Sequence, residues 1–398
     1  MDTPFLGLAP FLRASIAGND LRAMGQEMLT LAGERGDDAN LWMNLSLAMQ
    51  CIGQRDLGLA IQAQALAMRR IYPLPAAVQP AKLRVLMLMV PGDLAANTPL
   101  ECLLENSDID LVYYYVTAGD PLSLPVPEHD VLLVAMGDSD ENRPLLAALE
   151  NDLANWPKPV INAPHFIPAT DRSVASVLLK DAPGVLIPPT LYVSRTVLSE
   201  IARGEVRLAD LVEGCGFPII LRPVGSQAGQ DLEKFDRPED VAPYLERVAD
   251  PEFFLSRFVD YSDKDGLFRK YRVAMIDGVP FACHMGVSSN WMVHYVNAGM
   301  YEDAAKREEE ARFMENFDEF AARHREALAA IRERNGLDYL CIDCAETADG
   351  QLLIFEADHC MVVHAMDPED LFPYKQVHML KVKNAFRDYL FRLKAAQS

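Results

Sequence analysis

The sequence has little basic charge and no long hydrophobic segment. Of its 398 residues, 37 are lysine or arginine and 58 are aspartate or glutamate, which gives a formal net charge of -21. Nucleic acids are bound mainly through an excess of basic residues, so this balance argues against such a partner. No apolar run reaches the length of about 18 residues that a membrane-spanning helix needs, so we expect no membrane partner either.

The chain also lacks the spacing of a disulfide framework and a secretory signal. Its seven cysteines follow no such spacing, and the N-terminus has no basic segment followed by an apolar one. These absences predict a cytoplasmic protein, where thiols stay reduced. A composition that is 50% hydrophobic and 24% charged is typical of a soluble globular protein, and 398 residues predict two or three domains.

The most informative segment lies near the C-terminus. Two short apolar runs, 339–342 and 352–355, flank the pair Asp349-Gly350. An Asp-Gly pair between apolar runs is a strong turn signal for a β-hairpin. We therefore expect two antiparallel strands in this region.

Three acidic residues lie at the open end of this hairpin. Glu356 and Asp358 are two residues apart, so they project from the same face of a strand, and the hairpin brings Asp343 back beside them. Three converging carboxylates repel one another unless a cation lies between them. Mg²⁺ prefers such oxygen ligands when it also binds substrate phosphates, although a hairpin with solvated acids fits the same pattern.

Residues 1–75 are predicted to be helical. Apolar residues recur at helical spacing on both sides of Gly53. One face carries Leu41, Trp42, Leu45 and Met49, and the other carries Leu57, Ile61, Ala65 and Met68. The pattern resembles a tetratricopeptide repeat, and a plain helical hairpin fits it equally well. Such paired helices commonly bind a peptide or protein; alternatively, they only dock onto the rest of the chain or form a homodimer.

The remainder of the chain alternates strands and helices. A proline-rich linker at 73–80 leads into an α/β unit at 81–166. Its predicted elements are strands at 83–90, 111–116, 131–135 and 159–161 and a helix at 143–155. Beyond it we expect strands at 217–222, 253–259, 271–276 and 279–285, one charged helix at 301–335 and a closing helix at 374–394.

Two features of this remainder point to a phosphate ligand. The small-residue loop 225–229 follows a strand, and small residues let backbone N–H groups approach a phosphate closely. Arg222 and Arg272 lie among apolar strand residues, where an unpaired cation is costly. A phosphate partner or a structural ion pair would each account for the two arginines, and the loop is not a Walker A motif.

The order of these features resembles the ATP-grasp superfamily, which includes D-alanine–D-alanine ligase and glutathione synthetase. The features are the small-residue loop, Arg272 before an Asp-Gly hairpin, and the three acids. The resemblance covers roughly residues 81–390. It implies a mixed α/β chain with an ATP-grasp fold, whose central subdomain spans 167–255 and whose C-terminal subdomain, with the metal site, spans 256–398. The open α/β domain at 81–166 and the tetratricopeptide-like helices at 1–75 precede it.

The resemblance also implies the roles of individual residues. The family binds two Mg²⁺ with an Asp and, about a dozen residues on, a Glu-x-Asn; these positions are taken by Asp343, Glu356 and Asp358, and Mn²⁺ is an alternative ion. The implied ATP-binding residues are Arg172, Arg222, Gly225, Ser226, Gln227, Gly229, Ser256, Arg257 and Phe258. Arginines stand at 172 and 222 where the family has lysines, and arginine keeps the charge and binds phosphate through two hydrogen bonds.

The implied reaction joins a carboxylate to an amine with ATP, through an acyl-phosphate. Arg272 would stabilise that acyl-phosphate, and Glu356 would bridge the two metal ions. The substrates implied are amino acids or peptides. The two lysine-to-arginine changes favour an alternative, a catalytically silent ATP-grasp-like protein that binds a partner through its helices.

The sequence allows more than one role for the polar residues near the acids. His359, Cys360 and His364 follow Asp358 directly or closely, and they either touch substrate or are satisfied structural groups. A polar loop precedes the charged helix and either binds an amino acid or peptide or satisfies its own backbone. Its polar and aromatic residues are Ser288, Ser289, Asn290, Trp291, His294 and Asn297.

Overall fold

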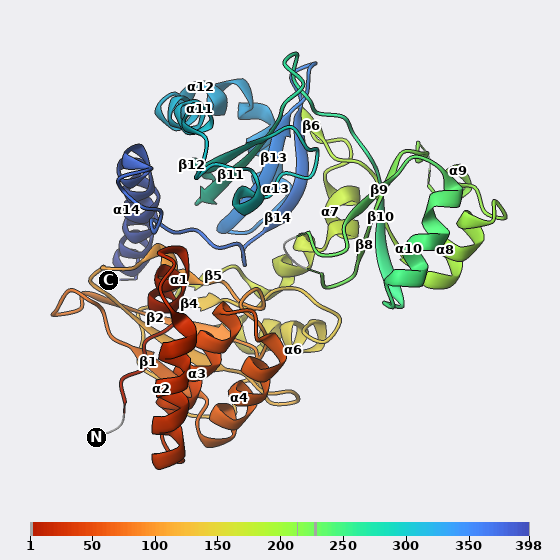
Figure 1. Cartoon of the computed structure of the whole chain (residues 1–398). Coiled ribbons are helices and arrows are strands. Elements are labelled where there is room, and N and C mark those ends of the chain that lie inside the picture. The colour runs from red at the N-terminus through yellow and green to blue at the C-terminus, as the bar shows by residue number, and fades with distance from the viewer. Residues whose placement is uncertain (1–2, 213, 227–228, 398) are drawn as a thin grey trace.

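A computed structural model describes residues 3–212, 214–226 and 229–397. The described residues form three β-sheets with helices packed around them, which confirms the mixed α/β class (Figure 1). No helix in these ranges is both long enough and apolar enough to cross a membrane.

Four helices come first. They are α1 (Ala9–Ile16), α2 (Leu21–Glu34), α3 (Ala39–Cys51) and α4 (Arg55–Met68). Asp20 and Asp38 cap the N-termini of α2 and α3 by accepting backbone N–H groups. On α4, Ile61 is buried against the other helices, whereas Leu57 and Met68 are exposed. The predicted apolar face of α4 is therefore only partly used in packing.

The first sheet has the strand order β1-β3-β2-β4-β5. Its elements are β1 (Ile71–Leu74), β2 (Leu83–Met89), α5 (Leu100–Leu103), β3 (Ile109–Tyr115), β4 (Val131–Val134), α6 (Arg143–Leu153) and β5 (Val160–Ile161). β1 is antiparallel to β3, and the other strands are parallel. The prediction that 73–80 is only linker is wrong at its start, because Pro73 lies in the edge strand β1, where a missing N–H breaks no ladder.

The helices share a core with this sheet. Phe5, Phe11 and Met43 belong to the same buried cluster as Val85 and Leu133 of the strands. Leu6 and Asn44 also join the N-terminal segment to α3, since the Leu6 N–H donates to the Asn44 side chain at 2.9 Å. The N-terminal helices therefore pack as part of the α/β body.

The second sheet is antiparallel, in the order β7-β10-β8-β9, and has its own core. Its elements are β7 (Thr190–Ser194), α8 (Arg195–Ala202), α9 (Leu208–Leu211), β8 (Ile219–Pro223), β9 (Glu233–Phe235), the 3₁₀ turn η2 (Pro238–Asp240), α10 (Val241–Arg247) and β10 (Glu252–Arg257). The subdomain boundary predicted between 255 and 256 falls inside β10.

The third sheet has the order β12-β11-β13-β14-β6. Its strands are β6 (Val185–Leu186), β11 (Phe268–Ile276), β12 (Val279–Ser288), β13 (Tyr339–Glu346) and β14 (Leu352–Asp358). The helical elements around it are η1 (Pro164–Thr170), α7 (Arg172–Leu178), η3 (Tyr295–Asn297), α11 (Ala304–Glu315), α12 (Phe317–Arg323), α13 (Arg325–Asn335) and α14 (Pro373–Ala395). The single helix predicted at 301–335 is wrong, because the chain breaks at Asn316 and His324 into three helices.

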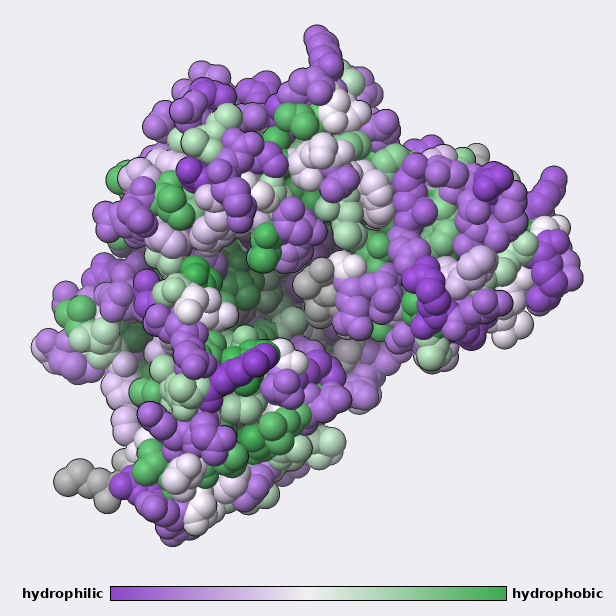
Figure 2. Space-filling model, in the orientation of Figure 1, coloured by the Kyte–Doolittle hydropathy of each residue, from purple (hydrophilic) through white to green (hydrophobic). Residues whose placement is uncertain are grey.

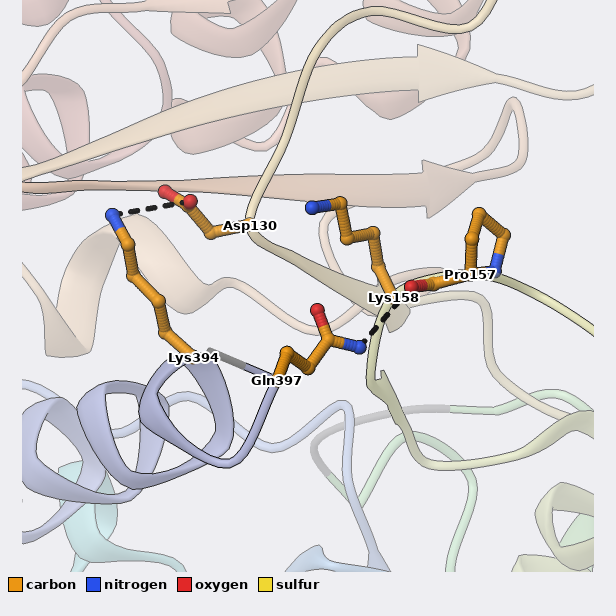
Figure 3. A pocket seen from close by; sticks show the side chains of 5 residues that line it. All are labelled: Asp130, Pro157, Lys158, Lys394 and Gln397. Atoms are coloured by element: carbon orange, nitrogen blue, oxygen red, sulfur yellow. Dashed lines mark hydrogen bonds and ion pairs between the residues drawn. The ribbon is translucent and has the colours of Figure 1, made fainter.

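The C-terminal helix α14 joins the third sheet to the first. Arg387 forms an ion pair with Asp108 at 2.7 Å. Near the end of the chain, Lys394 pairs with Asp130 at 3.1 Å and Gln397 donates to the Pro157 carbonyl at 3.2 Å (Figure 3). The surface pocket that these residues form with Lys158 contains none of the predicted site residues.

Asn162 is a second link between the first and third sheets. It is fully buried and has a φ of 56°, in the left-handed region that asparagine tolerates better than most residues. Its side chain donates to the Tyr339 carbonyl at 2.9 Å and accepts the Tyr339 N–H at 3.0 Å. Its own N–H donates to Asp338 at 2.9 Å. Asn162 therefore satisfies the backbone at the start of β13.

We expect Asn162→Ala to lower the free energy of unfolding by about 2 to 4 kcal/mol, because two buried backbone groups lose their partners and alanine disfavours the positive φ. Urea denaturation measures this loss. Asn106→Ala is the matched control, since Asn106 has a φ of 59° and is exposed. Equal losses in the two variants would show that the bridge to β13 contributes nothing.

Candidate active site

A row of ionisable side chains crosses four neighbouring strands of the third sheet. In register, His284 of β12 lies opposite Arg272 of β11, Arg272 lies opposite Asp343 of β13, and Asp343 lies opposite Glu356 of β14. The register shifts next to this row in both hairpins, after Arg272 and after Asp343. Bulges of this kind occur often beside functional sites, where they redirect side chains.

Asp343 is the centre of the row and is almost fully buried. Arg272 binds both of its carboxylate oxygens, at 2.8 and 3.1 Å, and Lys270 pairs with it at 2.7 Å. Burial alone would raise the pKa of Asp343, but Arg272 and Lys270 outweigh burial and hold the pKa well below its usual range. Asp343 is therefore a carboxylate at neutral pH.

Glu356 is paired with an arginine from a different part of the chain. Arg172 forms an ion pair with Glu356 and donates to the Phe355 carbonyl at 2.9 Å. Arg172 begins α7, directly after Asp171, which caps that helix. Burial raises the pKa of Glu356. The charges of Arg172 and, to a smaller extent, Arg222 lower it by more than burial raises it, so the net shift is downward.

Arg222 is a partly buried cation at the end of β8. Its Nε donates to the Ser226 hydroxyl at 3.3 Å, and it also donates to the Ser226 carbonyl. It forms no ion pair with any carboxylate in the described part of the chain. Burial, followed by the neighbouring charge of Arg172, lowers the pKa of Arg222 to about 10.

These residues line one cleft of about 600 Å³. Figure 2 shows the molecule hollowed at its centre, with apolar surface between hydrophilic outer faces. The predicted site residues on the cleft wall are Arg172, Arg222, Gly229, Ser256, Arg257, Phe258, Arg272, Asp343, Glu356 and Asp358. Gly225 and Ser226 do not line the cleft, and Gln227 lies outside the described residues.

Two loops approach each other at the cleft. Gly229 has a φ of 76°, and a Cβ on it would lie 3.4 Å from the Met292 sulfur. Trp291, from the same loop as Met292, packs edge-on against Phe258, with 5.6 Å between the two ring centroids. The polar loop predicted from the sequence therefore lies at the cleft, beside the small-residue loop.

Three of the implied ATP-binding residues, Ser256, Arg257 and Phe258, lie on β10 or directly after it. Ser256 lies on it between β7 and β8, so its backbone belongs to the sheet. The N–H of Phe258, just after the strand, donates to the Pro218 carbonyl at 2.9 Å. Val259 and Tyr261 follow and also line the cleft. A planar ring bound here would meet side-chain surface of β10 and the segment after it.

The three predicted metal ligands share a face, but cations of the chain already neutralise two of them. Arg272 and Lys270 bind Asp343, and Arg172 binds Glu356. The chain itself therefore supplies counter-charges to two of the three acids, and their role as metal ligands stays a prediction. Asp358 lies opposite Cys341 across the hairpin and has a different neighbourhood, with His359 Nδ1 at 3.5 Å from its Oδ1.

The sequence patterns single out neither Lys270 nor His284 of the site. Lys270 lies two residues before Arg272 on the same strand face, and strand alternation alone would place it there. A recess of about 150 Å³ continues the cleft past Lys270 and Arg272. His284, His294 and His364 line this recess, and burial is the first cause that lowers the pKa of each. They are neutral at pH 7.

No model of a known protein family matches the chain, and no curated protein matches it significantly. Among solved structures it is similar to ATP-grasp ligases. One is the D-alanine–D-alanine ligase of Bacillus anthracis in complex with ATP, with 12% identity over 79% of this chain and 100% of that chain and a TM-score of 0.47. Another is the RimK-domain ATP-grasp protein of Sphaerobacter thermophilus, with 16% identity, 77% and 99% coverage and a TM-score of 0.43. With TM-scores below 0.5, these similarities support no functional conclusion by themselves.

We expect Asp343→Asn to lower the free energy of unfolding at pH 7 by about 3 to 5 kcal/mol, because Arg272 and Lys270 would remain buried without their counter-charge. The folded-state pKa of Asp343 lies below the unfolded value of about 3.9. The wild type therefore has this contribution above that value and loses it as the pH falls toward the folded value. Urea denaturation at neutral and acidic pH should show a smaller acid loss in the variant.

Asp265→Asn is the control for this comparison. Asp265 is exposed and pairs with Arg269 at 2.7 Å, so its removal should change stability little. Equal effects of the two substitutions would contradict a structural role for the Asp343 cluster.

Proposed function

We propose that this chain is an ATP-dependent ligase that joins a carboxylate to an amine through an acyl-phosphate and releases ADP. The observation that carries the proposal is the pair Arg172 and Arg222. Two neighbouring guanidinium groups face one cleft, and Glu356 is the one described carboxylate that pairs with either of them. Adjacent cations of this kind call for an anionic ligand with more than one charge.

A triphosphate fits this end of the cleft. Arginine binds phosphate oxygens through two parallel hydrogen bonds, and the small-residue loop beside Arg222 is held by its contacts to Ser226. When phosphate binds, Arg172 would exchange part of its contact with Glu356 for phosphate oxygens. That exchange frees Glu356 for a metal ion.

The other end of the cleft suits a nucleoside. Apolar side chains in or directly beside the second and third sheets line the cleft, among them Ile187, Ile220 and Leu353. Phe258 and Val259 extend this surface after β10. A flat base gains apolar burial here, while the phosphates reach the arginines.

The acidic residues of β13 and β14 fit Mg²⁺. Asp343, Glu356 and Asp358 lie on one strand face, and a carboxylate has about four acceptor sites, of which Arg272 and Lys270 use three on Asp343. Mg²⁺ binds oxygen ligands together with substrate phosphates. When bound, it would neutralise charge that develops on the transferred phosphoryl group.

The chain's own residues then position the reactants. Arg272 and Lys270 lie between the phosphate end of the cleft and the recess. A substrate carboxylate held there would attack the γ-phosphate, and the same two cations would stabilise the acyl-phosphate. An amine then displaces phosphate and an amide forms. A recess of about 150 Å³ suits a substrate as small as an amino acid.

The N-terminal helices also reach this cleft. Leu12 and Ile16 of α1 line its wall. We therefore place one end of a peptide substrate along α1, with a free amino acid as the other substrate. The second candidate function is a catalytically silent nucleotide-binding protein, which the full neutralisation of Asp343 by Arg272 and Lys270 favours.

Arg222→Met should weaken ATP binding by at least tenfold, since a charge-assisted hydrogen bond contributes about 1.5 to 3 kcal/mol. It should not lower stability, because the lost charge is partly buried and has no carboxylate partner in the described chain. Calorimetry with ATP and Mg²⁺ measures the affinity, and urea denaturation measures the stability. Arg247→Met, at an exposed ion pair with Glu233, is the control.

An unchanged ATP affinity in the Arg222 variant would remove the main support for a phosphate site. A stability loss as large as that of Asp343→Asn would show that Arg222 is structural instead.

ADP release with pairs of amino acids and peptides tests turnover. We expect release with at least one pair and none with Glu356→Gln, which removes an anionic ligand with little change of shape. The Glu356 variant should still bind ATP. Release that grows with peptide length in the wild type and falls in Ile16→Glu supports peptide contact with α1.

The competing outcomes are distinct. ATP binding without ADP release from any pair favours the silent protein. Equal release by the wild type and Glu356→Gln would rule out Glu356 as a metal ligand for turnover.

A further inference from the structure

Three consecutive residues at the end of β14 gather their ligand atoms at one point. One atom each from Asp358, His359 and Cys360 lies within 4.8 Å of the other two, and no other group of three His, Cys, Asp or Glu residues in the described ranges does so. The Cys360 N–H donates to Asp358 Oδ1 at 3.0 Å, which turns the chain and brings the three side chains together.

Contacts with the first sheet fix the orientation of His359. Its Nε2 lies 3.1 Å from the Met136 carbonyl, just after β4. A carbonyl oxygen only accepts, so Nε2 carries the proton and, in the neutral ring, Nδ1 carries a lone pair. Metal-binding histidines almost always donate their other ring N–H in this way.

The Nδ1 lone pair has no hydrogen-bond partner. His359 is fully buried, and its Nδ1 is one of the few buried polar atoms of the described residues without a partner. It lies 3.5 Å from Asp358 Oδ1, which is itself an acceptor. Two acceptors that face each other in a buried place repel unless something positive lies between them. A metal ion bound to both would satisfy each.

We propose that Asp358, His359 and Cys360 form a binding site for a transition-metal ion, of which Zn²⁺ is the best match. An oxygen, a nitrogen and a sulfur ligand suit Zn²⁺, whereas Mg²⁺ takes oxygen ligands. Asp358 and Cys360 line the cleft, so the ion enters from there and keeps its fourth position open toward it.

Metal binding breaks one covalent bond, the S–H bond of Cys360. Cys360 binds as a thiolate, so its S–H proton passes to solvent as the sulfur–metal bond forms. In the described structure the thiol lies 3.7 Å from the Ala135 carbonyl and 3.8 Å from His359 Nε2. No oxidant or reductant takes part.

The site shares Asp358 with the Mg²⁺ site of the proposed ligase. Its ligands are complete without nucleotide, and it would coexist with Mg²⁺ at Asp343 and Glu356. If the ligase proposal holds, the ion occupies the place of the second Mg²⁺, beside the phosphates.

Metal titration of the untagged, reduced chain without nucleotide tests the proposal. We expect one Zn²⁺ per chain by calorimetry and, with Co²⁺, the near-ultraviolet absorption band of a thiolate–cobalt bond. His359→Gln and Cys360→Ser should each weaken Zn²⁺ binding at least tenfold, and Cys360→Ser should abolish the cobalt band. Cys51→Ser, on α3 and only partly buried, is the matched control and should keep both.

The absence of the cobalt band from the wild type overturns the proposal, even if a variant fails to fold. Equal Zn²⁺ affinity in the wild type and both ligand variants overturns it as well. Calorimetry with ATP and Mg²⁺ on His359→Gln separates the two proposals. If His359→Gln still binds ATP but no longer binds Zn²⁺, the two sites are separate. If the wild type binds Zn²⁺ but not ATP, the result contradicts the ligase proposal and leaves the Zn²⁺ proposal intact.

Discussion

The buried ion cluster at Asp343 is the constraint on which the site depends. Asp343 lies in the middle strand of the third sheet, and only its contacts with Arg272 and Lys270 make a buried charge tolerable there. Those contacts require the register of β11 against β13, so the sheet and the charge cluster specify each other. The counter-charge of Glu356 comes from outside the sheet, from Arg172 of α7.

Contacts at the cleft join the different parts of the molecule. Arg172 belongs to α7, Arg222 belongs to the second sheet, and the first sheet holds the segment after β14 through Met136. The cleft is therefore a meeting point of groups that each part supplies singly. None of the three sheets supplies all of the residues that line the cleft.

Local patterns predict much of the fold and only part of the site. The Asp-Gly turns at 277–278 and 349–350 fix two hairpins locally, so the acidic face of the second hairpin follows from strand alternation. The contact of Arg272 with Asp343 spans 71 residues, and that of Arg172 with Glu356 spans 184. No periodicity records such pairings. The sequence therefore predicts that the three acids share a face, but not that Arg272, Lys270 and Arg172 pair with two of them.

The attachment of α14 has a consequence for the order of folding. This last helix reaches back to residues near the start of the first sheet, since Lys394 donates to the Lys82 carbonyl across 312 positions and Arg387 pairs with Asp108 across 279. Contacts so distant in the chain form slowly, because a very long loop has to close first. On the ribosome, the surface that α14 covers stays uncovered until residues Pro373–Ala395 have been synthesised. The first sheet therefore stays partly exposed while the more than 200 residues between it and α14 are synthesised.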